Sequence, residues 1–307
     1  MKRIQKLIYI LTVLGILYFL YFHRKDLTHL THIHPAEILL LSFVAILPGF
    51  MNSLIFRHVI SLFNIHLKFV EWYGLTISNT MYNYILPARS GMALRAVYLS
   101  KYHHFSIPNY ISLTAATYMF GFLNASFLAT IICIFLTLHN QLEHVLFLKI
   151  SSILFLASMT LLVLLGKFNP SWLSENNKVT RILKKIALGL TAFKKNRRHI
   201  VKLMLLHLLF ILITSLKLTI VFWVIDLPVS YLKIILINSL IALSLVISIT
   251  PGNLGIKEGI IGISSGILGI QFDQAVLGAV LDRIVSMIVI MILGLIFSNR
   301  LLKRIPL

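Results

Sequence analysis

Long apolar runs alternate with short polar segments along almost the whole chain. The runs lie near residues 4–22, 37–56, 71–86, 90–105, 110–138, 145–166, 200–225, 231–249, 252–269 and 275–298. A helix needs about 20 mostly apolar residues to cross the hydrocarbon core of a bilayer, and several of these runs reach that length. The pattern therefore predicts an all-α polytopic membrane protein.

Two pairs of runs are too short for separate crossings. The first pair is interrupted at Pro87 and the second at Pro251-Gly252. Since Pro removes a backbone donor and breaks a helix, we expect each pair to form a re-entrant helical hairpin, one over 71–105 and one over 231–269. The prediction is about six full spans plus two hairpins, or about eight helices if the hairpins are counted as spans.

Composition and charge support this class of protein. Of the 307 residues, 58% are hydrophobic and 12% charged, and 28 lysines and arginines against 9 acidic residues give a formal charge of +19. In a soluble protein this imbalance would suggest a nucleic-acid partner. Here the basic residues collect between the apolar runs, which indicates orientation by the positive-inside rule and attraction to anionic lipid headgroups, with no nucleic acid as a partner.

The densest basic segment sets the expected topology. The stretch 167–202 holds ten basic residues and one acid, Glu175, so we expect it to be cytoplasmic, together with both termini. The chain is then a single membrane domain over 1–307, with a first half 1–166, a cytoplasmic linker 167–199 and a second half 200–307.

An even number of crossings must lie on each side of this linker, so the two hairpins enter from opposite faces and their tips meet. That is the arrangement of inverted-repeat transporters. The linker also shows helical spacing of apolar residues from Val179 to Phe193. We interpret it as an amphipathic helix that lies on anionic lipid, the alternative being a solvated basic connector.

Charged residues at membrane depth are the candidate functional positions. Each costs roughly 2.5–3.5 kcal/mol at the bilayer centre, so it is expected to face a polar cavity or a partner. Guanidinium groups bind phosphate in a bidentate way, and an adjacent basic and acidic pair would form the lip of such a cavity. The candidates for substrate binding are Arg89, Arg95, Lys217, Lys257, Glu258 and Arg283, with Asp282 and Glu258 as candidates for coupling.

Backbone breaks would complete a midplane anion site. Helices that begin after each Pro would aim free N–H groups at the ligand. The candidate hinge residues are Pro87, Gly91, Pro251, Gly252 and Gly255.

Two structural alternatives stay open. Thr76, Asn79 and Asn83 form one polar stripe, which contacts the ligand or supplies hydrogen bonds between helices. Glu258 and Arg283 either act on the substrate or form a structural ion pair.

The sequence predicts no metal site and no cofactor. The single cysteine, Cys133, excludes an intrachain disulfide and a cysteine metal cluster. The histidines His23, His29, His32 and His34 lie close together, but a short loop without acidic or cysteine partners does not favour zinc.

Both broken segments resemble motifs of a known family. The stretches LPARSGMALRAVYLSKYHHFS (86–106) and ITPGNLGIKEGIIGISSGILGI (249–270) are similar to two motifs of the lysylphosphatidylglycerol synthase transmembrane-region family, also called the flippase-like domain. The resemblance covers roughly residues 4–300. The residues that match the motifs are Pro87, Arg89, Gly91, Arg95, Pro251, Gly252, Gly255, Lys257 and Glu258, with Arg283 matching an arginine of the following helix.

The resemblance implies a multi-pass protein of the cytoplasmic membrane of a bacterium or archaeon that moves lipid-linked molecules between leaflets. Two departures bear on coupling: Met92 stands where the family usually has aspartate, and 114–127 lacks the family's acid-arginine pair. The chain resembles a stand-alone member without the soluble synthase domain, so lysyl-lipid synthesis is not expected.

The leading hypothesis is therefore translocation of an anionic phospholipid or polyprenyl-linked lipid with a phosphate-bearing headgroup, by a protein that is not an enzyme. A membrane-embedded transferase is the first alternative, and it would need a general base or a metal. The second is a scaffold that recruits a glycosyltransferase or lipid-modifying enzyme through 178–198. No prediction of oligomeric state follows from the sequence.

Overall fold

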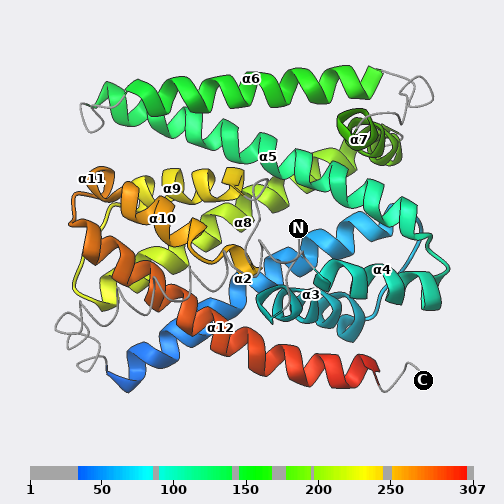
Figure 1. Ribbon diagram of the computed structural model, residues 1–307, viewed down its shortest axis with the longest axis horizontal. Helices are drawn as coiled ribbons and strands as arrows, with labels where there is room; N and C mark the ends of the chain where they lie inside the picture. Colours follow the sequence, from blue (N-terminus) through cyan, green and yellow to red (C-terminus); the bar gives the residue numbers. More distant parts are fainter. Residues whose placement is uncertain are drawn as a thin grey trace.

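The computed structural model describes residues 34–85, 90–139, 145–167, 178–194, 197–244 and 251–302, and all regular structure in these ranges is helical (Figure 1). The predicted first span 4–22 and the candidates Pro87 and Arg89 lie outside the described residues. The elements in chain order are α2 (Pro35–Ser61), α3 (Phe69–Ile85), α4 (Ser90–His103), α5 (Ile107–Leu138), α6 (Val145–Lys167), α7 (Lys178–Lys194), α8 (Arg197–Val224), α9 (Tyr231–Ser244), the one-turn 3-10 helix η4 (Pro251–Asn253), α10 (Ile256–Ile263), α11 (Ser265–Leu268) and α12 (Phe272–Leu302).

Four helices, α2, α5, α8 and α12, are long and apolar enough to cross a bilayer. Shorter apolar helices lie within α6 and at α9. Side chains such as Leu39, Ile153 and Ile292 are more than half exposed to the surroundings of the chain, as expected where lipid is the solvent. The prediction of an all-α polytopic membrane protein is confirmed.

The first predicted hairpin is present as two antiparallel helices, α3 and α4. Near the break, the Gly91 N–H donates to Asn83 Oδ1 at 3.1 Å. At the other end of the pair, Glu71 Oε1 accepts from the Tyr98 hydroxyl at 3.0 Å and lies 3.3 Å from His103 Nε2. Contacts at both ends hold the two arms side by side.

The second break differs in detail from the expected hairpin. Its turn uses left-handed backbone at Gly252 (φ 58°), Asn253 (φ 55°) and Gly255 (φ 82°). The arm that follows is divided at Ser264 into α10 and the short α11, where one continuous helix was expected. The glycines of 252–269 explain the difference, since each lowers helix stability by about 1 kcal/mol relative to alanine.

Helix ends gather at two opposite ends of the molecule (Figure 1). The end of α2 lies at the right of the view. His58 Nε2, near this end of α2, contacts the His199 carbonyl oxygen on α8 at 3.0 Å. Gly74, near the start of α3, packs against Phe297 and Leu301, near the end of α12. The start of α2, the connection between α8 and α9, and α11 lie at the left. The topology predicted from charge also puts the linker, the base of the first hairpin and the end of α12 on one side; their orientation in a membrane stays a prediction.

The predicted amphipathic helix of the linker is α7, and protein covers much of its apolar face. Leu190 and Phe193 are buried, and the Phe193 ring lies 5.2 Å from that of Phe120 on α5. Ile182 and Leu188 of the same helix stay exposed. The amphipathic helix α7 is thus docked on the bundle.

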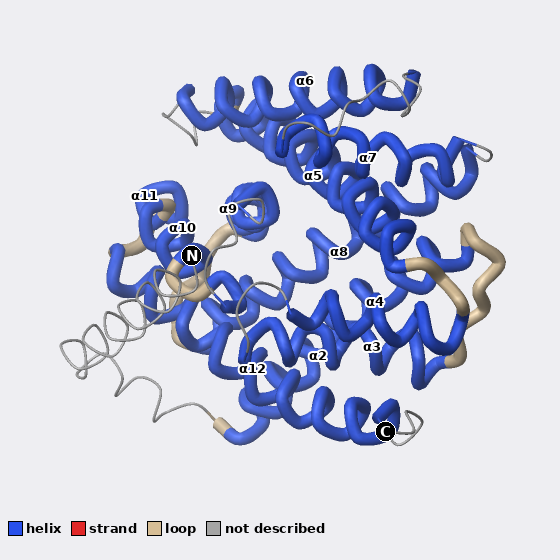
Figure 2. Tube along the Cα trace, turned by 45° about the vertical axis from the view of Figure 1, so that its right-hand side comes forward, coloured by secondary structure: helices blue, strands red, loops and turns tan. Residues whose placement is uncertain are grey.

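In both views α6 forms the outermost layer on α5, on the far side from α12 (Figure 2).

Candidate functional site

The ends of the two broken segments lie against each other. A Cβ added at Gly252 would lie 2.6 Å from the Tyr84 ring, near the end of α3. The Arg283 guanidinium carbon is 5.9 Å from the centre of the same ring. The structure therefore brings the end of α3 next to the Pro-Gly break.

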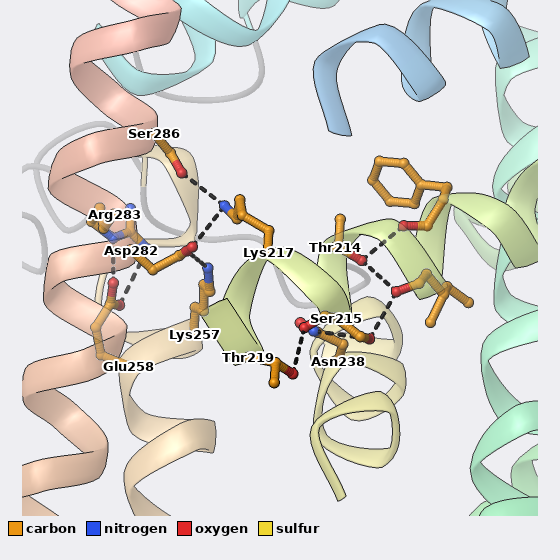
Figure 3. Close-up of polar contacts among 12 residues, drawn as sticks. Thr214, Ser215, Lys217, Thr219, Asn238, Lys257, Glu258, Asp282, Arg283 and Ser286 are labelled. Atoms are coloured by element: carbon orange, nitrogen blue, oxygen red, sulfur yellow. Dashed lines mark hydrogen bonds and ion pairs between the residues drawn. The ribbon is translucent and has the colours of Figure 1, made fainter. Parts of the chain in front are cut away.

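Arg283 on α12 holds the Pro-Gly break in place (Figure 3). Its Nε bonds directly to Glu258 Oε1, and its Nη2 donates to Glu258 Oε2 at 3.2 Å. The same guanidinium donates to the carbonyl oxygens of Gly252 at 3.0 Å and Asn253 at 3.1 Å. One side chain thus satisfies carbonyl groups that the break would otherwise leave without donors.

Glu258 also caps its own helix, α10. Its Oε2 accepts from the Gly255 N–H at 2.8 Å. The carboxylate three residues later therefore occupies the Gly255 N–H, which does not belong to the N–H groups expected to face a ligand. Glu258 is 4% exposed, and both of its oxygens are bonded. The contacts favour a structural ion pair with Arg283 over a substrate contact.

A second group of charges joins α8, α10 and α12 beside this ion pair (Figure 3). Lys217 Nζ lies 2.8 Å from Asp282 Oδ1 and donates to Ser286 Oγ at 2.8 Å. Lys257 Nζ bonds to Asp282 Oδ2. Asp282 is 1% exposed, so two ammonium groups share one deeply buried carboxylate.

The charges of this region do not balance. Among the described residues, the three cations Lys217, Lys257 and Arg283 face the two carboxylates Asp282 and Glu258, so one positive charge is in excess. A buried charge without a partner is costly in an apolar medium. The arrangement can therefore accept one further negative charge.

Polar residues continue from Lys217 toward α9. Asn238 donates to Ser215 Oγ at 3.1 Å, and the Thr214 hydroxyl bonds within α8 to the Phe210 carbonyl oxygen at 2.9 Å. Sequence reasoning did not select Ser215 or Asn238. Asn238 could have been recognised as an amide side chain within an apolar run. Ser215 could have been recognised as a hydroxyl two residues before Lys217, in another apolar run.

Arg95 on α4 is a buried cation of a different kind. It is 9% exposed, and within the described parts of the chain its Nε and Nη2 have no hydrogen-bond partner. Its guanidinium carbon lies 4.1 Å from the centre of the Phe56 ring on α2. A cation–π contact stabilises a desolvated charge of this kind by about 2 kcal/mol or more, but it leaves the N–H groups unsatisfied.

The predicted polar stripe on α3 divides into separate roles. The Thr76 hydroxyl bonds to the Trp72 carbonyl oxygen of its own helix, and Asn83 joins the two arms through Gly91. Asn79 is 8% exposed, and no described group bonds its Oδ1. Asn83 therefore supplies a hydrogen bond between helices, whereas Asn79 keeps an acceptor oxygen for a ligand.

Comparison with known proteins identifies the family. The family model of the lysylphosphatidylglycerol synthase TM region matches residues 6–294, which is nearly the whole chain. A search of curated proteins finds no match to this chain. The matched region includes both broken segments and each charged residue described above. The chain therefore belongs to the lysylphosphatidylglycerol synthase transmembrane-region family, a family of membrane domains with a lipid-related function.

Proposed function

We propose that the protein moves a lipid with a polar, phosphate-bearing headgroup between the leaflets of the membrane. The family supports a lipid-related role for a transmembrane region, which is compatible with a transporter that performs no covalent chemistry. The observation that carries the proposal is Arg95, a buried guanidinium that lacks a described hydrogen-bond partner at two of its nitrogens.

The free atoms of Arg95 suit a phosphate. Nε and Nη2 form one edge of the planar guanidinium, and their N–H groups point in parallel, as bidentate binding of an oxyanion requires. A phosphate at this edge would satisfy both donors and neutralise the charge. Asn79 on the facing arm would add an acceptor for a headgroup hydroxyl.

The broken segments explain how a headgroup could pass. Irregular backbone at membrane depth is tolerated where it is buried in protein or lines a wet path. In inverted-repeat transporters substrate sites lie where such breaks meet, and here Tyr84 meets Gly252. The headgroup would cross at this contact while its tails stay in lipid.

Lipid flipping by the purified protein in liposomes tests the proposal. We expect Arg95→Ala to slow flipping of a fluorescent phosphatidylglycerol at least about tenfold, and Arg95→Lys to give an intermediate rate because it keeps the charge but loses the bidentate edge. Arg57→Ala is the matched control, since Arg57 is exposed on α2 beside Phe56. Equal flipping by folded Arg95→Ala and Arg57→Ala would contradict the assignment.

A further inference from the structure

The lysine pair beside the Pro-Gly break has the features of a second ligand site. We infer that Lys217 and Lys257 bind the phosphate of the translocated headgroup. Without ligand, Asp282 is the counter-ion of both ammonium groups, and the phosphate replaces it as the partner of one or both of them. The inference rests on the proposed function and adds to it a site, a ligand class and a mechanism of exchange.

Lys217, Lys257 and Asp282 form a trio that carries excess positive charge. Asp282 neutralises one of the two ammonium groups that it contacts, so the trio keeps one positive charge. A phosphodiester carries one negative charge and several acceptor oxygens. Its arrival would make the trio neutral, which removes the cost of an uncompensated charge at membrane depth.

Lys217 and Lys257 have hydrogen-bond donors available for a further ligand. An ammonium group has three donors. Lys257 Nζ has one described hydrogen bond, to Asp282, and Lys217 Nζ has one, to Ser286. Asp282 Oδ1 lies 2.8 Å from Lys217 Nζ but accepts no well-directed hydrogen bond within the described chain. Both lysines therefore keep donors for an incoming oxyanion.

The neighbouring ion pair of Arg283 and Glu258 has more hydrogen-bond partners than the lysines have. Arg283 and Glu258 bond to each other and to three backbone groups of the break: the carbonyl oxygens of Gly252 and Asn253 and the N–H of Gly255. If Arg283 or Glu258 exchanged partners, the turn at the Pro-Gly break would lose these hydrogen bonds. Within this cluster, a ligand can therefore exchange with Asp282 at Lys217 and Lys257, while the Arg283–Glu258 pair keeps its geometry.

The lysine pair and Arg95 lie on different helices. Arg95 on α4 contacts Phe56, near the end of α2. Lys217 is in the second half of α8, and Lys257 is near the start of α10. Two phosphate stations would let a headgroup move in steps, each with a compensated charge.

Ligand affinity of the full chain in a sugar-based detergent, which contains no phosphate, tests the site directly. The probes are a short-chain phosphatidylglycerol, glycerophosphoglycerol (the same phosphodiester without acyl chains) and a short-chain diacylglycerol without phosphate, each measured by calorimetry. We expect Asp282→Asn to tighten binding of the phosphate probes about tenfold, since the competing carboxylate is gone, and Lys217→Gln or Lys257→Gln to weaken it at least about tenfold. Lys149→Gln, which removes an exposed lysine of α6, is the control for overall charge and should change affinity less than about twofold.

The probes distinguish the source of the phosphate. Tighter binding of the short-chain lipid than of glycerophosphoglycerol supports a lipid headgroup, and equal binding supports the same anion site with a soluble ligand. Equal binding of the diacylglycerol would overturn the site. Unchanged affinity for the phosphate probes in the Asp282 and both lysine variants would overturn it as well.

The lysine variants test the site even if Asp282→Asn fails to fold. Each of them leaves one ammonium group paired with one carboxylate, so it is expected to fold. Lysine-dependent binding by a protein that does not flip lipid would refute the proposed function and retain the site. Flipping that is normal in folded lysine variants would refute the site and retain the function.

Discussion

Replacement of Gly91 by alanine tests the packing of the first hairpin. Gly91 follows the break and lies on the backbone of the facing arm, where an added Cβ would be 2.1 Å from the Asn79 carbonyl oxygen. Ordinary van der Waals contact begins at 3.4 Å, so the two arms would have to separate by about 1.3 Å. A backbone carbonyl cannot rotate away as a side chain can.

We expect Gly91→Ala to lower the free energy of unfolding by about 3 kcal/mol, the upper part of the range for overpacking. Gly259→Ala is the matched control, because nothing lies within 4 Å of a Cβ at this helical glycine of α10. There alanine should raise stability by about 0.5–1 kcal/mol through its higher helix propensity. The two glycine-to-alanine variants thus differ in sign.

The chain supplies its own reporter for this measurement. Cys133 is the single cysteine and is fully buried between α5 and its neighbours, so a thiol-reactive dye reports unfolding as fluorescence on heating. Gly91→Ala should become reactive at a lower temperature than the unmodified protein, and Gly259→Ala at an equal or higher one. Identical transitions in all three proteins would refute the close packing of α3 on α4.

Three further results are expected. Arg283→Lys should lower stability by about 2–3 kcal/mol in the same dye assay, because an ammonium cannot reproduce the four hydrogen bonds of the guanidinium; an unchanged transition would show that the Pro-Gly break does not depend on it. Phe193→Ala should loosen α7 by up to about 3–5 kcal/mol and speed tryptic cleavage within this basic helix, whereas truncation of the exposed Ile182 should not; equal cleavage rates would argue against docking of α7 on α5. Single cysteines at the exposed positions Arg197 and Gln271 should react with an impermeant maleimide from opposite sides of the membrane; labelling of both from one side would contradict the predicted topology.

Much of the fold could be predicted from local properties of the sequence. Run length predicts which helices cross a bilayer, and α2, α5, α8 and α12 agree with the expectation. The spacing of apolar residues in the linker predicts α7, and Pro87 and Pro251 mark the two breaks. These features depend on hydropathy and backbone chemistry, which each segment carries by itself.

Other features depend on which segments meet. Sequence depth selected Lys217 and Asp282 as separate candidates, but their contact joins helices about 65 positions apart in the chain. The division of the second arm at Ser264 and the docking of α7 on α5 likewise escaped prediction, because neighbouring helices decide whether a short helix continues and what covers its apolar face.

The sequence by itself determined that this chain is a helical membrane protein with two broken segments and an unusual number of charges at membrane depth. Only the tertiary structure decided how those charges are used. It pairs Glu258 with Arg283 around the break, lets Lys217 and Lys257 share Asp282, and leaves two nitrogens of Arg95 without a described partner. The physical reason is that the cost of a buried charge follows from its type and depth, whereas its compensation depends on atoms brought within about 3 Å by packing.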